Sequence, residues 1–328
     1  MYNYSTHALE DMRALLSSVQ RPEVVCGVEM RAPEHLVAPL EPLCGLLAEA
    51  PKFALPNNGD LLMGDWGRVL EMATDEYLRL PFPSVAMEFP FSDVTRMAQD
   101  RILIPKRIVL ALEYEHYKDT YFGRAAERGV HGRGDLDGAV LLVPVYRTDL
   151  WLPYPFFAVV SPKRGGCYSG LVYSGGDGGR IESSVGYTVV PIGGYSDSMI
   201  AEHGPKKAYG IALSDVAEEV FVLLALTVAL SCSNVGVVDS PSPDKLNKKR
   251  TKNGKLPFFG YKQIVIRPTG ESRRGDASNS SSGRQAPRLH HRRGHIRNLD
   301  GGAKRVWVRP AMVGDGTRGV IHSDYTII

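Results

Sequence analysis

One segment restricts the possible folds of this chain more than any other. The run Val220–Leu230 spans eleven residues, and Thr227 is the only one of them with a polar side chain. A membrane-spanning helix needs about 20 such residues, so the run predicts a helix buried in a protein core. Ser214 or Asp215 can begin that helix, because a glutamate three residues after Asp215 fits a variant of the capping box. We therefore expect a long helix near 214–231 that packs across a sheet.

Helical periodicity also marks the N-terminal part of the chain. Apolar residues recur at three- and four-residue spacing over 6–19, 35–49 and 66–80, which predicts three helices. Thr6 is the candidate N-cap of the first helix. Pro42 lies inside the second pattern, where it predicts a kink or a late start.

The middle of the chain has a different pattern. Short runs rich in β-branched and aromatic residues alternate with Pro, Gly and Asp, as strands alternate with turns. The stretch 164–195 is rich in Gly, Ser and Tyr and has room for two or three short strands. Together with the helices, this pattern predicts an α+β fold with a central antiparallel or mixed sheet. The predicted strands are 84–89, 102–112, 139–146, 156–160 and 261–267.

Charge is divided unevenly along the chain. Residues 241–310 contain 18 Lys and Arg but only 4 Asp and Glu, whereas the rest of the chain contains 21 basic and 32 acidic residues. Dense Lys and Arg bind polyanions by neutralising phosphates and releasing counterions, so nucleic acid is the expected partner. We predict an acidic α+β body at 1–233 and a basic, β-rich C-terminal region at 234–328. Low apolar content predicts a flexible loop near 269–287.

The basic region contains two runs with strand character, Leu289–Arg297 and Lys304–Arg309, which flank Asp300-Gly301. This arrangement is typical of a β-hairpin. Because alternate residues of a strand share a face, His291 and His295 are expected on the same side as the arginines at 293 and 297.

The register of this hairpin decides which side chains meet, because a shift of one residue moves every side chain to the other face. If the loop is centred on Gly301, His295 lies opposite Trp307. A two-residue turn instead places the His and Arg face opposite Val306 and Val308. The need to bury the two valines favours the first register, in which His, Arg and Trp form one patch.

Such a patch suits nucleic acid, because Arg binds phosphates while Trp and His stack on bases. The leading hypothesis is a nucleic-acid-binding protein, with RNA or single strands slightly favoured over duplex. The first alternative is a metal-independent nuclease in which His291 and His295 act as general acid and base. The second is a non-enzymatic protein-interaction factor that inhibits a host protein or joins an assembly. The predicted nucleic-acid-binding residues are Lys245, Lys248, Lys249, Arg250, Arg292, Arg293, Arg297, Arg305, Trp307 and Arg309.

The order of motifs in the C-terminal third resembles the signature of uncharacterised proteins encoded by tailed bacteriophages and prophages. The resemblance covers chiefly 234–328, with a further matching segment at 80–89. It implies a phage-encoded protein that acts in the host cytoplasm, and it implies no particular activity. The motifs that carry it are Asp239-Ser-Pro, Lys245-Leu-Asn-Lys-Lys-Arg-Thr-Lys-Asn-Gly-Lys, Arg288-Leu-His-His-Arg-Arg-Gly-His-Ile-Arg, Trp307-Val-Arg, Val313-Gly-Asp and Asp324-Tyr325.

Several function classes lack their sequence signals. No nucleotide-binding glycine motif and no nucleophile elbow is present, so the sequence predicts no cofactor. No Cys or carboxylate lies close enough to the histidines near 290–295 to complete a metal site. The N-terminus lacks the pattern of a secretory signal, and no segment predicts a membrane partner.

Overall fold

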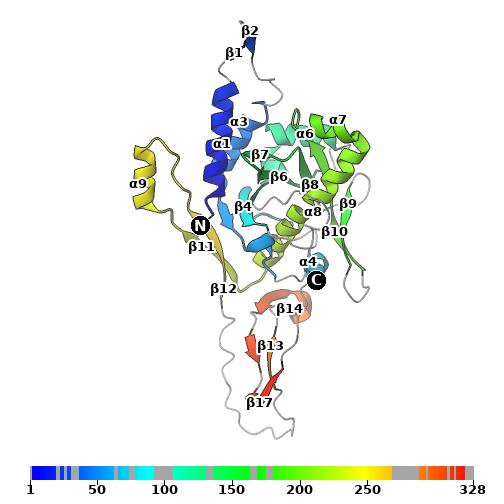
Figure 1. The fold of residues 1–328 in the computed structure, drawn as a ribbon. Coiled ribbons are helices and arrows are strands. Elements are labelled where there is room, and N and C mark those ends of the chain that lie inside the picture. Colours follow the sequence, from blue (N-terminus) through cyan, green and yellow to red (C-terminus); the bar gives the residue numbers. More distant parts are fainter. Residues whose placement is uncertain are drawn as a thin grey trace.

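The computed structural model confirms an α+β architecture (Figure 1). The predicted flexible loop near 269–287 lies outside the described residues. The structure describes residues 2–19, 23–25, 28–30, 37–62, 66–73, 78–91, 106–130, 136–162, 168–174, 180–267, 288–292, 295–308, 311–313 and 315–321.

The helices precede, interrupt and follow the strands. The α-helices are α1 (Tyr4–Val19), α3 (Leu40–Glu49), α4 (Trp66–Met72), α5 (Tyr114–Tyr117), α6 (Tyr121–Gly129), α7 (Asp197–His203), α8 (Pro205–Leu230) and α9 (Asp244–Lys252). The strands up to α8 are β1 (Glu23–Val25), β2 (Val28–Met30), β3 (Lys52–Ala54), β4 (Ser84–Pro90), β5 (Lys106–Glu113), β6 (Val140–Arg147), β7 (Trp151–Pro153), β8 (Phe156–Ser161), β9 (Ser169–Ser174) and β10 (Arg180–Pro191). The later strands are β11 (Val235–Ser240), β12 (Tyr261–Ile266), β13 (Arg288–Arg292), β14 (His295–Leu299), β15 (Lys304–Val308), β16 (Ala311–Val313) and β17 (Asp315–Ile321).

A ten-stranded mixed sheet forms the centre of the molecule. Its strand order is β11-β12-β3-β4-β5-β6-β8-β10-β9, and β7 pairs with β6. The pairs β12–β3 and β3–β4 are parallel, while the other pairs in this sheet are antiparallel. Strands β11 and β12 come from the basic C-terminal part of the sequence, yet they complete one side of this sheet. The predicted mixed sheet is therefore present, and the basic region contributes two strands to it.

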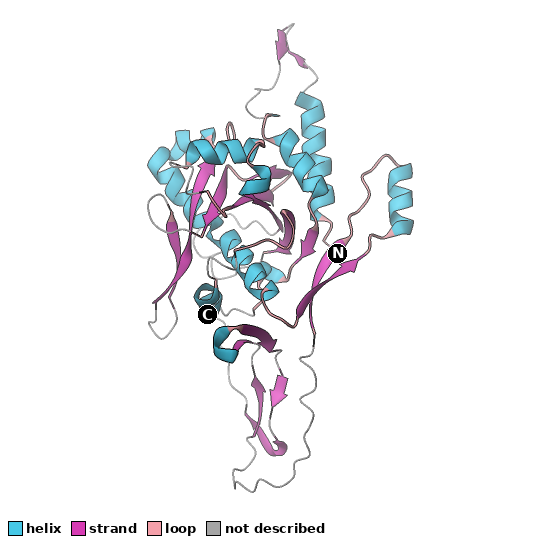
Figure 2. Ribbon diagram, turned by 180° about the vertical axis from the view of Figure 1, so that it is seen from behind, coloured by secondary structure: helices cyan, strands magenta, loops and turns pink. Residues whose placement is uncertain are grey.

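Each face of the sheet buries its own apolar core. Strand β5 shows the division, because Val109 and Ala111 lie in the core beneath α4 and α8, whereas Ile108 and Leu110 lie in the core beneath α1, α3 and α6. Successive strand residues point to opposite faces. A central strand with helices on both faces therefore buries successive residues, as β5 does from Arg107 to Leu112. Figures 1 and 2 show helices on both faces of the sheet.

Helix α8 confirms the predicted buried helix and extends it toward the N-terminus. It begins at Pro205, not at 214, and continues to Leu230 across the sheet. Asp215 is therefore an interior residue and not a cap, and its carboxylate accepts a hydrogen bond of 2.8 Å from the Tyr154 hydroxyl. The capping-box prediction was wrong because proline at the first helical position also begins a helix. None of the described helices is both long and apolar enough to cross a bilayer.

The N-terminal helices also differ from prediction at their starts. Helix α3 begins at Leu40, which is the late start that Pro42 suggested. Helix α1 begins at Tyr4, so Thr6 lies inside it. Its first amides are instead satisfied by a carboxylate from β4, because Glu88 accepts hydrogen bonds of 2.9 Å from the backbone N–H groups of Tyr4 and Ser5.

Candidate nucleic-acid interface

A protruding segment carries most of the described surface lysines of the basic region. We call residues 241–260 the arm; it leaves the sheet at β11, forms α9 and returns at β12. Figures 1 and 2 both show α9 standing away from the rest of the molecule. Seven of the nine residues of α9 are exposed, and the other two, Asn247 and Arg250, are half-buried. A helix this short and this polar is marginal by itself, so specific contacts must hold it.

Asn247 and Arg250 provide those contacts. The Asn247 side chain donates a 2.9 Å hydrogen bond to the carbonyl of Phe258 and accepts one of 2.7 Å from the Phe258 N–H. Arg250 donates to the carbonyl of Leu256 and to the carboxylate of Glu10 on α1, each at 2.6 Å, and its guanidinium lies 4.0 Å from the Phe258 ring centroid. These two residues bind α9 to the returning chain and to α1.

The end of α9 is also defined by its sequence. Gly254 adopts a φ of +68°, a left-handed conformation that glycine enters without steric cost. Its N–H donates to the Thr251 carbonyl, and the Lys255 N–H donates to the Arg250 carbonyl, both at 3.0 Å. This pair of bonds is a Schellman motif, which satisfies carbonyls that a helix end otherwise leaves unpaired.

The lysines of α9 lie on the side opposite its attachments. At about 100° of rotation per residue, Lys248, Lys252, Lys245 and Lys249 fall in this order within an arc of about 100°. The centre of that arc lies directly opposite the midpoint between Asn247 and Arg250. All four lysines are exposed. The helix therefore turns its attachment side inward and presents a lysine stripe, defined as Lys245, Lys248, Lys249 and Lys252, to solvent.

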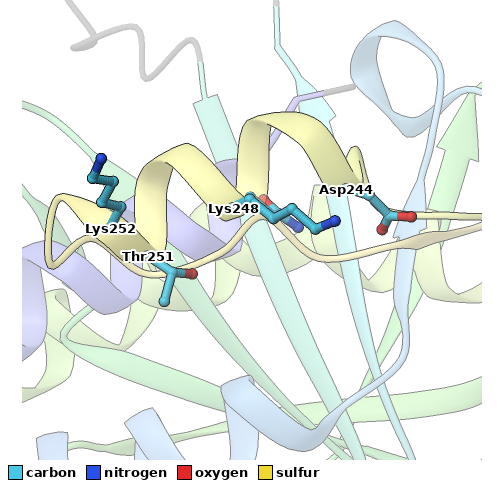
Figure 3. A pocket seen from close by; sticks show the side chains of 5 residues that line it. Asp244, Lys248, Thr251 and Lys252 are labelled. Atoms are coloured by element: carbon cyan, nitrogen blue, oxygen red, sulfur yellow. The ribbon is translucent and has the colours of Figure 1, made fainter.

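One flank of α9 is slightly hollowed. Figure 3 shows Lys248 extending along the helix toward Asp244, while Lys252 and Thr251 leave the helix in different directions. The depression between them has a volume of about 470 Å³ and is also lined by Asn247. It is open to solvent and lined by charged and polar residues, so it suits contact with a solvated, charged partner better than enclosure of an apolar ligand.

The structure thus divides the predicted electrostatic residues of the arm into two groups. Lys245, Lys248 and Lys249 share one exposed surface, whereas Arg250 is paired with Glu10 and stabilises the arm. Lys252 was missed from the predicted set. Helical periodicity over 244–252 places it within the same arc as the other lysines, so the signal for it was present in the sequence.

The C-terminal hairpin forms, but the preferred register was wrong. In the pairing of β14 with β15, Ile296 lies opposite Trp307, and Arg297 lies opposite Val306. The connecting segment is a four-residue loop, Asp300–Ala303, in which Gly301 has a φ of +67°. The even loop length places the His and Arg face opposite the valines, and a single His, Arg and Trp patch does not form.

Trp307 and Arg305 face the body of the protein. The Trp307 side chain is buried with Ile296 in the core beneath α8. Its backbone N–H and carbonyl bond to the side chain of Asn234, both at 2.8 Å. Arg305 donates a 3.2 Å hydrogen bond to the carbonyl of Met72. Trp307 therefore cannot stack on a base in this arrangement. The observed register buries both the indole and Val306, so burial of this valine does not require the predicted register.

The two predicted catalytic histidines lie on different sheets. His291 belongs to β13, which pairs with β16 and β17, whereas His295 belongs to β14, which pairs with β15. Alternate residues share a face only along one continuous strand. Because His291 and His295 lie on separate strands, their spacing in the sequence does not place them on a common face. Their side chains, that of Arg292, and residues Arg293 and Arg309 lie outside the described part of the structure.

Two cations remain exposed on the described part of the hairpin. Arg297 and Lys304 both have exposed side chains. They extend the positive surface of the basic region beyond the arm. No cluster of three or more His, Cys, Asp and Glu side chains that could hold a metal ion occurs among the residues that the structure places.

A buried lysine lies where the arm joins the sheet. Lys52 on β3 is 3% exposed, donates a 2.8 Å hydrogen bond to the Ala48 carbonyl and lies 3.8 Å from the Phe259 ring centroid. Burial lowers the pKa of this amine from 10.5 to about 8, and the nearby carboxylate of Glu88 opposes part of that shift. The charged form is therefore less favourable in the folded protein than in the unfolded chain.

This shift predicts a pH dependence of stability. Between pH 8 and 10.5 the unfolded chain binds more protons at Lys52 than the folded protein, so stability rises with pH in that window. Relative to a Lys52→Met variant, the free energy of unfolding of the unmodified protein should rise by about 3 kcal/mol across the window. Urea titrations of both proteins at several pH values measure the difference. A constant difference would show that Lys52 titrates normally.

No protein-family model, no curated protein and no solved structure matches the chain.

Proposed function

We propose that this protein binds nucleic acid through the arm. The observation that carries the proposal is the lysine stripe, four exposed ammonium groups on the side of α9 that faces away from its attachments. Lysines in the last turns of a helix also offset its dipole, but that effect needs no protruding helix and no alignment of four residues on one side. The arrangement is suited to phosphate contact.

The surroundings support the same function. The arm contains six cations, and Asp244 is the only acidic residue in 241–260. Arg250 is paired with Glu10, whereas the five lysines of the arm, including Lys255, are exposed. Arg297 and Lys304 provide a second exposed basic area. The resemblance of 234–328 to phage and prophage proteins supports a phage-encoded protein that acts in the host cytoplasm.

Salt dependence of binding tests this proposal. The full chain is titrated against a fluorescently labelled nucleic acid at 50–200 mM salt. Each phosphate contact contributes about 0.7–0.9 to the slope of log affinity against log salt. Replacing the four lysines of the stripe with alanine should flatten the slope by about 3 and lower the affinity at least about tenfold. The variant should remain folded, because alanine favours helix and Asn247 and Arg250 are retained.

A second variant serves as a matched control. Arg124, Arg128, Lys206 and Lys207 are also exposed, and their replacement by alanine removes the same charge from α6 and the first turn of α8. These elements lie away from α9 (Figure 1). The control should bind nearly as tightly as the unmodified protein. Equal losses in the two variants, or no binding by the unmodified protein at low salt, would refute binding through the arm.

A further inference from the structure

We infer that α9 binds in the major groove of B-form DNA and contacts its backbone without sequence preference. This inference rests on the proposed function and specifies its ligand. It departs from the expectation that RNA or single strands are favoured, because that expectation depended on a single patch of His, Arg and Trp, whereas the observed register differs and Trp307 is buried.

The dimensions of α9 suit the groove. A helix of nine residues is about 14 Å long and, with its side chains, about 10–12 Å in diameter. The major groove of B-form DNA is about 12 Å wide and 8.5 Å deep, and it admits an α-helix. To enter the groove, a helix must be free over more than half of its circumference. Helix α9 meets this condition, because its attachments use only the side that carries Asn247 and Arg250.

The lysine positions suit the two walls of the groove. Taking the direction away from the attachments as the centre, Lys252 and Lys245 lie within about 10° of it, one on each side. Lys248 and Lys249 lie about 50° away on opposite sides. A helix inserted along this direction turns Lys248 toward one phosphate backbone and Lys249 toward the other. A single strand offers only one backbone and leaves half of this arrangement without a partner.

The chemistry of the exposed side also favours duplex DNA. Binding to single strands relies on aromatic side chains that stack on bases, and the exposed residues of α9 include none. Duplex RNA has a deep, narrow major groove that side chains cannot enter. Lysine ammonium groups are point charges suited to phosphates, and the exposed residues of α9 include no Arg, Asn or Gln, whose planar groups pair with base edges in a fixed geometry. We therefore expect a common affinity for DNA duplexes of different sequence.

Five ligands of one length test the inference. The full chain is titrated against a 20-base-pair DNA duplex, against each of its strands alone, against an RNA duplex of the same sequence, and against a DNA duplex with bulky groups on pyrimidine C5. These groups project into the major groove. The plain DNA duplex should bind at least about tenfold more tightly than the other ligands. The lysine-stripe variant should lose that preference, while the control variant keeps it.

Two failures are distinguishable. If affinity depends on the lysine stripe but single strands, RNA or the modified duplex bind as tightly as the plain DNA duplex, the groove inference is wrong and the proposed function stands. If no ligand shows a dependence on the stripe, the proposed function itself is wrong.

Discussion

Replacing Arg107 with alanine should lower the free energy of unfolding by about 3–5 kcal/mol, the cost of removing one partner from a buried ion pair. The Nη1 atom of Arg107 donates 2.7 Å hydrogen bonds to both Glu218 and Glu219 of α8. The Glu219 side chain is fully buried, and it also accepts a 2.6 Å hydrogen bond from the Tyr146 hydroxyl. Without the guanidinium, two carboxylates remain close together between α8 and the sheet.

Chemical denaturation with linear extrapolation measures this loss. A Glu219→Gln substitution in the Arg107→Ala background should recover at least about 1 kcal/mol, because it removes the fully buried charge that Arg107 no longer compensates. Arg128→Ala is the matched control, since Arg128 is exposed on α6, and it should change stability by less than about 0.5 kcal/mol. A loss of less than about 1 kcal/mol for Arg107→Ala would contradict a role in compensating these carboxylates.

Replacing Glu88 with alanine should cost about 3–4 kcal/mol, more than the loss of an ordinary helix cap. Glu88 is fully buried on β4, and its carboxylate accepts bonds from the first two amides of α1 and a 2.6 Å bond from the Tyr261 hydroxyl. Burial, followed by the nearby Glu88 charge, raises the pKa of Tyr261, so that hydroxyl stays protonated and continues to donate. The substitution leaves three buried donors unpaired.

The location of the amides that exchange faster distinguishes this role of Glu88 from a general loss of stability. Amide hydrogen exchange should accelerate at Tyr4 and Ser5 and in β12 near Tyr261, because Glu88 joins α1, the sheet and the base of the arm. Tyr261→Phe removes one of the Glu88 bonds, together with the 2.7 Å bond that the Asn3 N–H donates to the Tyr261 hydroxyl, and should cost about 1–3 kcal/mol. Glu41→Gln changes an exposed glutamate in the first turn of α3 and serves as the control. A Glu88 variant as stable as the Glu41 variant would rule out the proposed connection.

The prediction of the fold succeeded where local periodicity carried the information. The apolar run at 220–230 had to be buried, and the run at 102–112 predicted a strand, which the structure describes as β5, Lys106–Glu113. Contact between the predicted interface residues and nucleic acid stays a prediction, but the exposure of three of them on one surface has the same local origin. Lys245, Lys248 and Lys249 lie on a helix whose own periodicity groups them, so neighbours in the sequence are neighbours on the surface.

The prediction failed where contact with a residue distant in the sequence determines the position of a side chain. Arg250 resembles its lysine neighbours in the sequence, but Glu10, 240 residues earlier, turns it inward. Asn234 and the core beneath α8 bury Trp307, and the loop Asp300–Ala303 sets the register that allows this. Such contacts depend on which surfaces the fold brings together, and hydrophobic burial there outweighs the local preference of a single strand.

The sequence by itself therefore determined the buried helix, a central sheet that was either antiparallel or mixed, and the concentration of positive charge after residue 240. Periodicity and charge density are local properties, which is why they could be recognised without a structure. Only the tertiary structure decided which cations stay exposed. Arg250 is paired with Glu10 and Arg305 donates to the Met72 carbonyl, while the four lysines of the stripe on α9 are exposed.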